Sequence, residues 1–159
     1  MFIRVGGSLF IMVNNDNVKY SIDQFTLSLS SKLIDLDWGT KALSIMQGIE
    51  HELGLNFFES IVDTNLPGYD YTRRFVCDNG AIFLACHTQH PNQGILLKFS
   101  AGGLREYLKN IGISILDIVK RLEKLEYLKE VHFSRLDFAV DFFNDDRTDL
   151  SKLSSDIDK

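Results

Sequence analysis

An Asn79-Gly80 dipeptide between two apolar runs constrains the fold of this 159-residue chain more than any other feature. Both residues accept the positive φ that a two-residue hairpin turn requires, so residues 69–77 and 81–88 are predicted to pair as antiparallel strands. A third strand-like run, residues 95–100, follows a short loop. Together the three runs predict an antiparallel meander.

The chain's two cysteines lie on this predicted hairpin. A turn at the Asn-Gly dipeptide places Cys77 opposite Ile82 and Cys86 opposite Arg73. The two sulfurs are then displaced along the hairpin and cannot form a disulfide in this register. We expect reduced thiols, as in a cytoplasmic protein without a secretory signal.

The remaining elements predict an α+β fold. Alternation of polar and apolar residues over 21–30 indicates a half-buried strand. Apolar side chains at three- and four-residue spacing predict main helices over 40–53 and 113–128, with a shorter helix over 104–110. Residues 131–143 form the last strand, which we expect to be the central, acidic strand of an antiparallel sheet. The two main helices are predicted to pack on the face opposite its charged side chains.

Length and composition fit one domain of ordinary size. We place it at residues 21–145, after a leader or edge strand over residues 1–20. An acidic, polar tail over residues 146–159 is read as the start of a missing second half. No apolar run approaches the roughly 18 residues of a membrane span, so we expect a soluble, cytoplasmic protein without a membrane partner.

The formal net charge of −5 argues against a non-specific nucleic-acid coat, because such binding depends on lysine and arginine. The charge is uneven along the chain. Residues 71–135 hold ten basic and six acidic residues, whereas the rest holds seven basic and sixteen acidic residues. The basic side chains of the middle segment are either ordinary solvated side chains or a surface that faces a polyanion.

The last strand carries the most unusual pattern. Alternation in VHFSRLDFAVDFF places Arg135, Asp137 and Asp141 on one face, around the small Ala139. Charges on an apolar strand are costly to bury unless they pair, bind a metal or line a cleft. One interpretation is an Arg135–Asp137 ion pair on a wet face, and the other is a polar pocket. The two aspartates have Cα atoms roughly 13 Å apart, so we expect only one of them to bind an ion directly.

This strand also resembles a family signature. Residues 134–141, SRLDFAVD, resemble the "T-R-hydrophobic-D-hydrophobic-A-hydrophobic-D" motif of the replication initiation factor family, the initiators of rolling-circle plasmid replication and related relaxases. Residues 68–71, GYDY, are similar to the family's glycine-tyrosine entry to the meander. Residues 94–105 are similar to its strand followed by S-G-x-x-x-R, with Ala101 where the family usually has glycine. The resemblance spans residues 21–145.

Members of this family cut one DNA strand with a tyrosine that becomes linked to the 5′ phosphate, assisted by a divalent metal. The resemblance therefore implies a Mg²⁺ or Mn²⁺ site at Asp137 and Asp141, with Arg135 as a supporting phosphate or carboxylate contact. It also implies origin or single-stranded DNA as the partner, together with a second copy of the chain and a host helicase.

We expect DNA contacts from basic side chains and from the glycine-rich turn before the short helix. The predicted DNA-binding residues are Arg73, Arg74, Lys98, Ser100, Gly102 and Arg105. Backbone amides at such a turn can meet a phosphate at the helix start. A plain strand-to-helix turn explains the glycines equally well.

The family's catalytic tyrosine has no counterpart at a matching position. The tyrosines present are Tyr20, Tyr69, Tyr71, Tyr107 and Tyr127, of which we expect Tyr107 and Tyr127 on helices. We therefore predict the N-terminal part of a DNA-nicking enzyme, inactive alone, whose nucleophile lies outside this chain. The alternative is a non-catalytic DNA- or protein-binding module with the same fold.

A histidine pair is a weaker candidate site. His87 and His90 form an H-x-x-H motif at a strand end, and no third ligand follows at a fixed spacing. We expect loop or surface histidines rather than a metal site.

Overall fold

The computed structural model describes residues 2–5, 8–11, 18–33, 37–63 and 66–142, with side chains over 21–33, 37–62 and 66–139. Contacts divide the chain into two units. The larger unit is Asp23–Asp137, and the smaller one combines Met1–Ile22 with Phe138–Lys159. The predicted tail over residues 146–159 lies outside the described residues.

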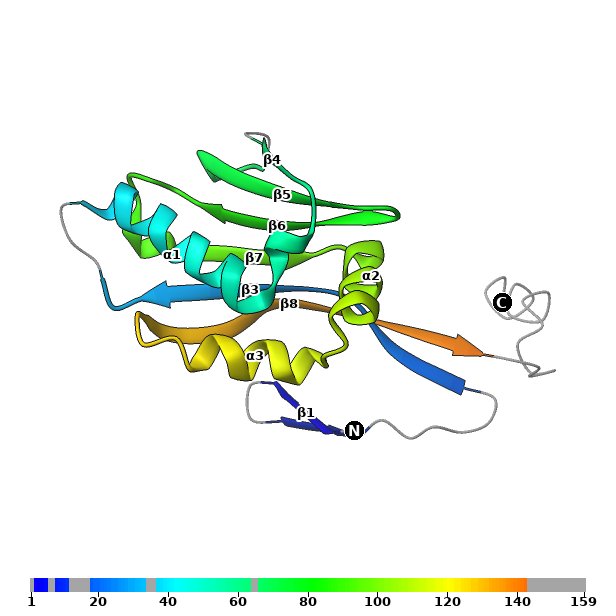
Figure 1. The fold of residues 1–159 in the computed structure, drawn as a ribbon. Helices are drawn as coiled ribbons and strands as arrows, with labels where there is room; N and C mark the ends of the chain where they lie inside the picture. The colour runs from blue at the N-terminus through cyan, green and yellow to red at the C-terminus, as the bar shows by residue number, and fades with distance from the viewer. Residues whose placement is uncertain (1, 6–7, 12–17, 34–36, 64–65, 143–159) are drawn as a thin grey trace, which may run out of the picture. The chain divides into compact units, whose positions relative to one another are not determined.

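The main sheet has six strands in the order β4-β5-β6-β7-β3-β8 (Figure 1). In chain order these are β3 (Val18–Ser31), β4 (Ser60–Asp63), β5 (Tyr71–Cys77), β6 (Gly80–Cys86), β7 (Ile95–Phe99) and β8 (Leu128–Phe142). The predicted α+β fold with an antiparallel meander is confirmed. The short strand β4 was not predicted, and residues 1–20 hold a separate hairpin of β1 (Phe2–Val5) and β2 (Ser8–Ile11).

One part of the predicted sheet is wrong, because the acidic strand β8 lies at the edge and not at the centre. The burial of its side chains agrees with an edge position. Among its described side chains only Leu128 is buried, whereas β7 in the interior buries Ile95, Leu97 and Phe99 completely. A strand with water along one edge tolerates charges that a central strand would have to neutralise.

Three helices accompany the sheet: α1 (Trp38–Leu53), α2 (Ala101–Ile111) and α3 (Ile115–Glu123). One-turn 3-10 segments, η1 (Leu55–Phe57) and η2 (Pro91–Gln93), lie between strands. Helix α1 ends at Gly54, whose φ of 67° is the left-handed value that favours glycine. Helix α3 begins at a Ser114 capping box and is shorter than predicted, because the chain turns after Glu123 into β8.

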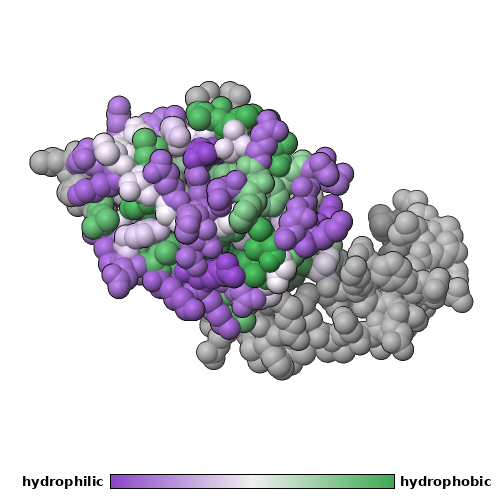
Figure 2. Space-filling view, viewed as in Figure 1, coloured by the Kyte–Doolittle hydropathy of each residue, from purple (hydrophilic) through white to green (hydrophobic). Residues whose placement is uncertain are grey.

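The core lies between the sheet and the helices, which cover one of its faces (Figure 1). Its fully buried apolar side chains include Phe25, Leu27, Phe75, Ile82, Leu84, Leu97 and Phe99 on strands and Ala42, Ile49, Leu53, Ile118 and Leu122 on helices. Full burial of one such large side chain stabilises the fold by roughly 1.5–3 kcal/mol. On the visible side of the molecule, polar residues are interspersed with small apolar areas (Figure 2).

The β5–β6 hairpin forms as predicted, but its turn is at Asp78 and Asn79. Cys77 therefore pairs with Gly80, and the predicted register is wrong by two positions. A two-residue turn at Asn79-Gly80 would require a positive φ at Gly80, and Gly80 does not adopt one. A shift of two residues preserves the faces of the strands and changes only the cross-strand partners.

Close packing explains the glycine at this turn. A Cβ atom on Gly80 would lie 2.5 Å from the amide nitrogen of Gly103 and 2.5 Å from Oγ of Ser100. The Asn-Gly dipeptide thus marks a hairpin, while its glycine serves the contact with α2.

Both cysteines are free and buried, as expected. In the observed register Cys86 lies opposite Tyr71. No helix among the described residues is both long enough and apolar enough to cross a bilayer.

Candidate nucleic-acid interface

The sheet face away from the helices carries a cross-strand row that runs from Ile61 on β4, opposite Arg74, to Thr26 on β3. Arg74 on β5 pairs with Phe83 on β6, Phe83 pairs with Lys98 on β7, and Lys98 pairs with Thr26 on β3. Directly opposed residues point to the same face of a sheet. We call Arg74, Phe83, Lys98 and Thr26 the open-face row.

Two cations that have no acidic partner among the described side chains flank one aromatic ring in this row. Arg74, Phe83 and Lys98 are partly exposed, and Nζ of Lys98 lies 5.7 Å from the centre of the Phe83 ring. The ion pairs among the described side chains are formed by Arg73, His87, Arg105 and Arg135. No carboxylate of the described side chains forms an ion pair with Arg74 or Lys98. Nε of Arg74 is buried without a hydrogen-bond partner.

The row is not exposed along the whole face. One register position further, Thr72 and Ala85 pair with each other and are fully buried. On the other side of the row Val76 is 38% exposed. Thr26 within the row is also buried, so the accessible part of the face is the part that includes Arg74, Phe83 and Lys98 and continues toward the β5–β6 turn.

A second polar group lies on the same face, where β3 meets β8. Arg135 holds Asp137 with Nε donating to Oδ1 at 2.9 Å and an Nη donating to Oδ2 at 2.7 Å. Gln24 donates to Asp137 as well. Because Gln24 alternates with the buried Phe25, this contact places Asp137 on the face opposite the helices, as predicted.

Of the two interpretations of the acidic strand, this geometry matches the ion pair on a wet face. The side chains of Arg135 and Asp137 are 59% and 34% exposed. Hydrogen bonds from Arg135, and then from Gln24, lower the pKa of Asp137 and keep it ionised. Phe133 does not follow the predicted alternation, because its ring packs edge-on against Phe25 on the helix side, 5.7 Å between centres.

The predicted metal site is not supported by the donor atoms. Both oxygens of Asp137 already accept hydrogen bonds from a guanidinium group. Across the part of the chain that the structure describes, no group of three or more His, Cys, Asp or Glu could hold an ion. The side chain of Asp141 lies outside the described residues. Asp137 as held here does not fit a metal ligand, and the role of Asp141 stays a prediction.

Arg73 lies on the helix face, unlike its neighbour Arg74. Its guanidinium donates to Oε2 of Glu50 at 2.7 Å and to Oγ of Ser60 at 2.7 Å. Burial raises the pKa of Glu50, while Arg73 opposes that shift. Arg73 therefore ties α1 to the strands beneath it and is turned away from the open-face row.

The glycine-rich turn before α2 is closed by the hairpin. Oγ of Ser100 caps the amide of Gly103 at 3.3 Å, accepts from the amide of Ala81 at 2.8 Å and donates to the carbonyl of Ala81 at 2.8 Å. A Cβ atom on Gly102 would lie 1.7 Å from the carbonyl oxygen of Asn79. These contacts support the plain strand-to-helix turn. Of this predicted set, Arg105 is exposed, with an Nη 3.3 Å from Asp23.

The described tyrosines that we expected on helices are not available as nucleophiles. Tyr107 lies on α2 as predicted, is fully buried, and donates to the carbonyl of Leu53 at 2.7 Å. Burial raises its pKa to about 12. Tyr127 lies in the turn before β8 rather than on a helix, and burial raises its pKa as well. The catalytic residue stays unassigned.

The histidine pair forms a small polar cluster. The rings of His87 and His90 are 4.0 Å apart between centres, and Nδ1 of His87 lies 3.4 Å from Oδ2 of Asp70. Thr88 donates to both carboxylate oxygens of Asp70. This cluster joins the end of β6 to the loop before β5, in line with the expected loop histidines.

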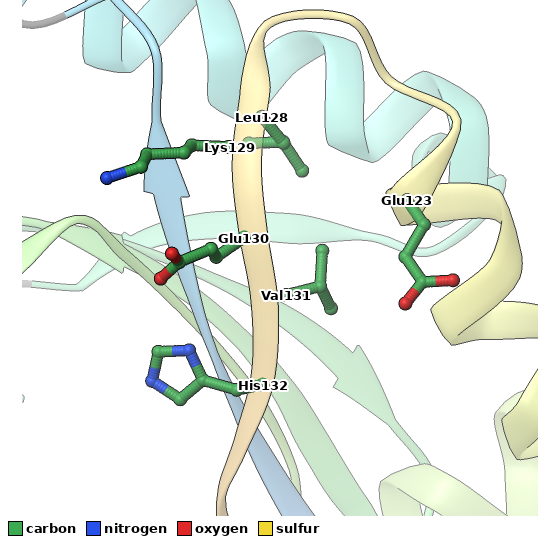
Figure 3. A pocket seen from close by; sticks show the side chains of 6 residues that line it. All are labelled: Glu123, Leu128, Lys129, Glu130, Val131 and His132. Carbon is green, nitrogen blue, oxygen red and sulfur yellow. The ribbon is translucent and has the colours of Figure 1, made fainter.

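Three hollows among the described residues of the larger unit lie away from the open-face row. One of about 370 Å³ lies between the end of α3 and β8 (Figure 3). There Val131 faces α3, while Glu130 and His132 point to the other side of the strand (Figure 3). Others, of about 460 and 620 Å³, adjoin α2. The polar groups of the first hollow thus do not converge on one point.

In comparisons with known proteins, no family model and no curated protein matches this chain. The open-face row is therefore judged on its own geometry. Sequence reasoning identified Arg74 and Lys98 but missed Phe83, because the assumed hairpin register did not place this ring opposite Arg74. The signal that could have found it is the aromatic residue at an outward position of AIFLAC.

Proposed function

We propose that this domain binds DNA through the open face of its sheet and does not cut DNA by itself. The observation that carries the proposal is the pairing of Arg74, Phe83 and Lys98 in one cross-strand row. Lysine and arginine that neutralise phosphates supply most of the affinity of proteins for DNA. With the resemblance to the replication initiation factor family, the proposed role is recognition of origin or single-stranded DNA in rolling-circle replication.

The charge distribution supports a local rather than a general DNA surface. The chain as a whole carries −5, so phosphate is repelled from most of the molecule. Arg74 and Lys98 lack an acidic partner among the described residues, and so their charge is available to a phosphate. Arg135, 59% exposed, extends the positive side chains toward β8.

Two features support the non-catalytic alternative over nicking. The carboxylate of Asp137 is held by Arg135 and Gln24. The hydroxyl of Tyr107 is buried in the core. Under this proposal the protein acts with DNA in the cytoplasm, and a second copy or a host helicase would be recruited as the family resemblance implies.

Fluorescence anisotropy of a labelled oligonucleotide, single-stranded and as a duplex, tests the proposal. Arg74→Glu with Lys98→Glu should weaken binding at least ten-fold and make the salt dependence shallower by about one to two ions, since two phosphate contacts are lost. The matched control is Lys109→Glu with Lys120→Glu, which changes the net charge equally on exposed positions of α2 and α3. Equal loss in both double variants, or no binding by the wild type, would contradict the proposal.

A second arm separates binding from cutting. The protein is incubated with single-stranded DNA and Mg²⁺ or Mn²⁺ and then denatured. We expect no covalent protein–DNA adduct. An adduct that resists denaturation would instead favour the DNA-nicking function.

A further inference from the structure

We infer that the open-face row is a stacking site for a base of single-stranded DNA, with Phe83 as the platform. This inference rests on the proposed function and specifies its ligand. Aromatic side chains in a positively charged groove are how proteins hold single strands without reading their sequence. The row presents that combination on three adjacent strands, with Arg74 on one side of the ring and Lys98 on the other.

The spacing of the row suits a nucleotide. Directly opposed residues of antiparallel strands have Cα atoms about 4.5–5.5 Å apart, so each cation starts one strand from the ring. Both cations have long side chains, which reach past the edges of a base that lies on Phe83. The phosphates on either side of that base then come within reach of Arg74 and Lys98.

The contact between Lys98 and Phe83 does not block the ring. The distance of 5.7 Å from Nζ to the ring centre is near the outer limit of about 6 Å for a cation–π contact. A base makes a larger contact with the Phe83 ring than the ammonium group of Lys98 does. When Lys98 leaves the ring, its ammonium group can pair with a phosphate instead. The contact therefore keeps the lysine beside the platform in the free protein.

A sheet surface favours a single strand over a duplex. The bases of a duplex are stacked on each other, so their faces are hidden from a side chain in a flat sheet. In a single strand the faces are free to stack on Phe83. Arg135 lies three strands from Phe83, about 14 Å across the sheet, where it can contact a further phosphate of the same strand.

The exposed side chains of the row hold no acceptor for the 2′-hydroxyl that distinguishes RNA. Proteins distinguish RNA through contacts to the 2′-hydroxyl. The one hydroxyl of the row belongs to Thr26, which is only 8% exposed. We therefore assign DNA as the ligand and expect RNA of the same sequence to bind no more tightly.

The test compares Phe83→Leu with Phe83→Tyr, which keeps the ring, and with Phe57→Leu, which removes an 81% exposed ring elsewhere. The probe is a short oligonucleotide with a central 2-aminopurine, used single-stranded and as a duplex. We expect Phe83→Leu to weaken single-strand binding roughly ten-fold or more with an unchanged salt dependence, because the cations remain. Phe83→Tyr and Phe57→Leu should bind like the wild type.

The wild type alone gives an independent readout if Phe83→Leu does not fold. Binding should quench 2-aminopurine in the single strand, as stacking on an aromatic ring does. Unchanged fluorescence, equal affinity for the duplex, or tighter binding of RNA would overturn the inference. If binding is salt-dependent and lost with Arg74→Glu and Lys98→Glu but indifferent to Phe83, the proposed function stands and this inference fails. If no DNA binds, both fail.

Discussion

At the residue scale, the contact between the β5–β6 turn and α2 depends on the absence of side chains. Gly80, Gly102 and Gly103 each meet backbone atoms where a Cβ would lie 2.5 Å away or closer. Among the described glycines, a positive φ occurs at Gly54, Gly68, Gly94 and Gly112. The glycines of the turn before α2 are therefore explained by close approach and not by backbone conformation.

Close approach and a positive φ predict different losses in the free energy of unfolding when glycine is replaced by alanine. Gly102→Ala places Cβ 1.7 Å from a backbone oxygen and should lower the free energy of unfolding by about 3 kcal/mol or more. Gly112→Ala meets nothing within 4 Å, so only its φ of 72° is unfavourable, which costs about 1–2 kcal/mol. Urea denaturation of both variants measures the difference. Equal stability of the two would contradict the packing role.

The two thiols give a second prediction at this scale. Burial raises the pKa of Cys77 and of Cys86 to about 11, from an ordinary 9.0. At pH 8 only about one thiol in a thousand is then ionised, and native protein should react with iodoacetamide far more slowly than protein in urea. The folded state holds these protons more tightly, so stability is intact below pH 9 and falls as the pH rises toward 11. Fast labelling of native protein at pH 8 would contradict this.

Phe83 is the residue of the candidate site that the sequence did not predict. A hairpin register shifted by two residues keeps the faces of β5 and β6 and changes the cross-strand partners. The cross-strand partner of each residue depends on where the turn begins, and here the turn begins one residue earlier than predicted, with Gly80 packed closely against α2. That contact is tertiary and has no local sequence signal, so the pairing of Phe83 with Arg74 was not predictable.

At the element scale, helix boundaries followed from local chemistry and strand order did not. Helix α1 ends at Leu53 as predicted and α3 begins two residues after its predicted start, because the caps at Gly54 and Ser114 are satisfied by neighbouring residues. The position of β8 at the edge depends on which strand pairs with β3, a choice made between distant segments. The sequence left two interpretations of the acidic strand open, an Arg135–Asp137 ion pair on a wet face and a polar pocket. Only the edge position of β8 and the contact of Asp137 with Gln24 distinguish the two.

The cap of α3 gives a prediction at this scale. Oγ of Ser114 accepts from the amide of Asp117 at 3.2 Å, and Asp117 accepts from the amide of Ser114 at 3.0 Å. Ser114→Ala should destabilise the protein by about 1 kcal/mol, as the loss of an N-cap does. Ser44→Ala, at an exposed position inside α1, is the control and should change stability by less than about 0.5 kcal/mol. Thermal unfolding of both variants measures this, and equal melting temperatures would show that the cap is dispensable.

At the scale of the larger unit, the two faces of the sheet are used differently. The helix face is filled by the core and closed by the Arg73–Glu50 pair. The other face carries the open-face row and the Arg135–Asp137 pair. Under the proposed function, the alternation of side chains along the same strands separates the core from the DNA-binding surface.

The most direct test of this account is to locate bound DNA on the protein by two-dimensional NMR. Titration of ¹⁵N-labelled protein with a short single-stranded oligonucleotide should shift the backbone amide signals of Arg74, Phe83 and Lys98, with smaller changes toward Arg135. The amides of α1 and α3 should stay unchanged. Shifts concentrated on the helices, or no shifts at saturating DNA, would contradict DNA binding by the open face.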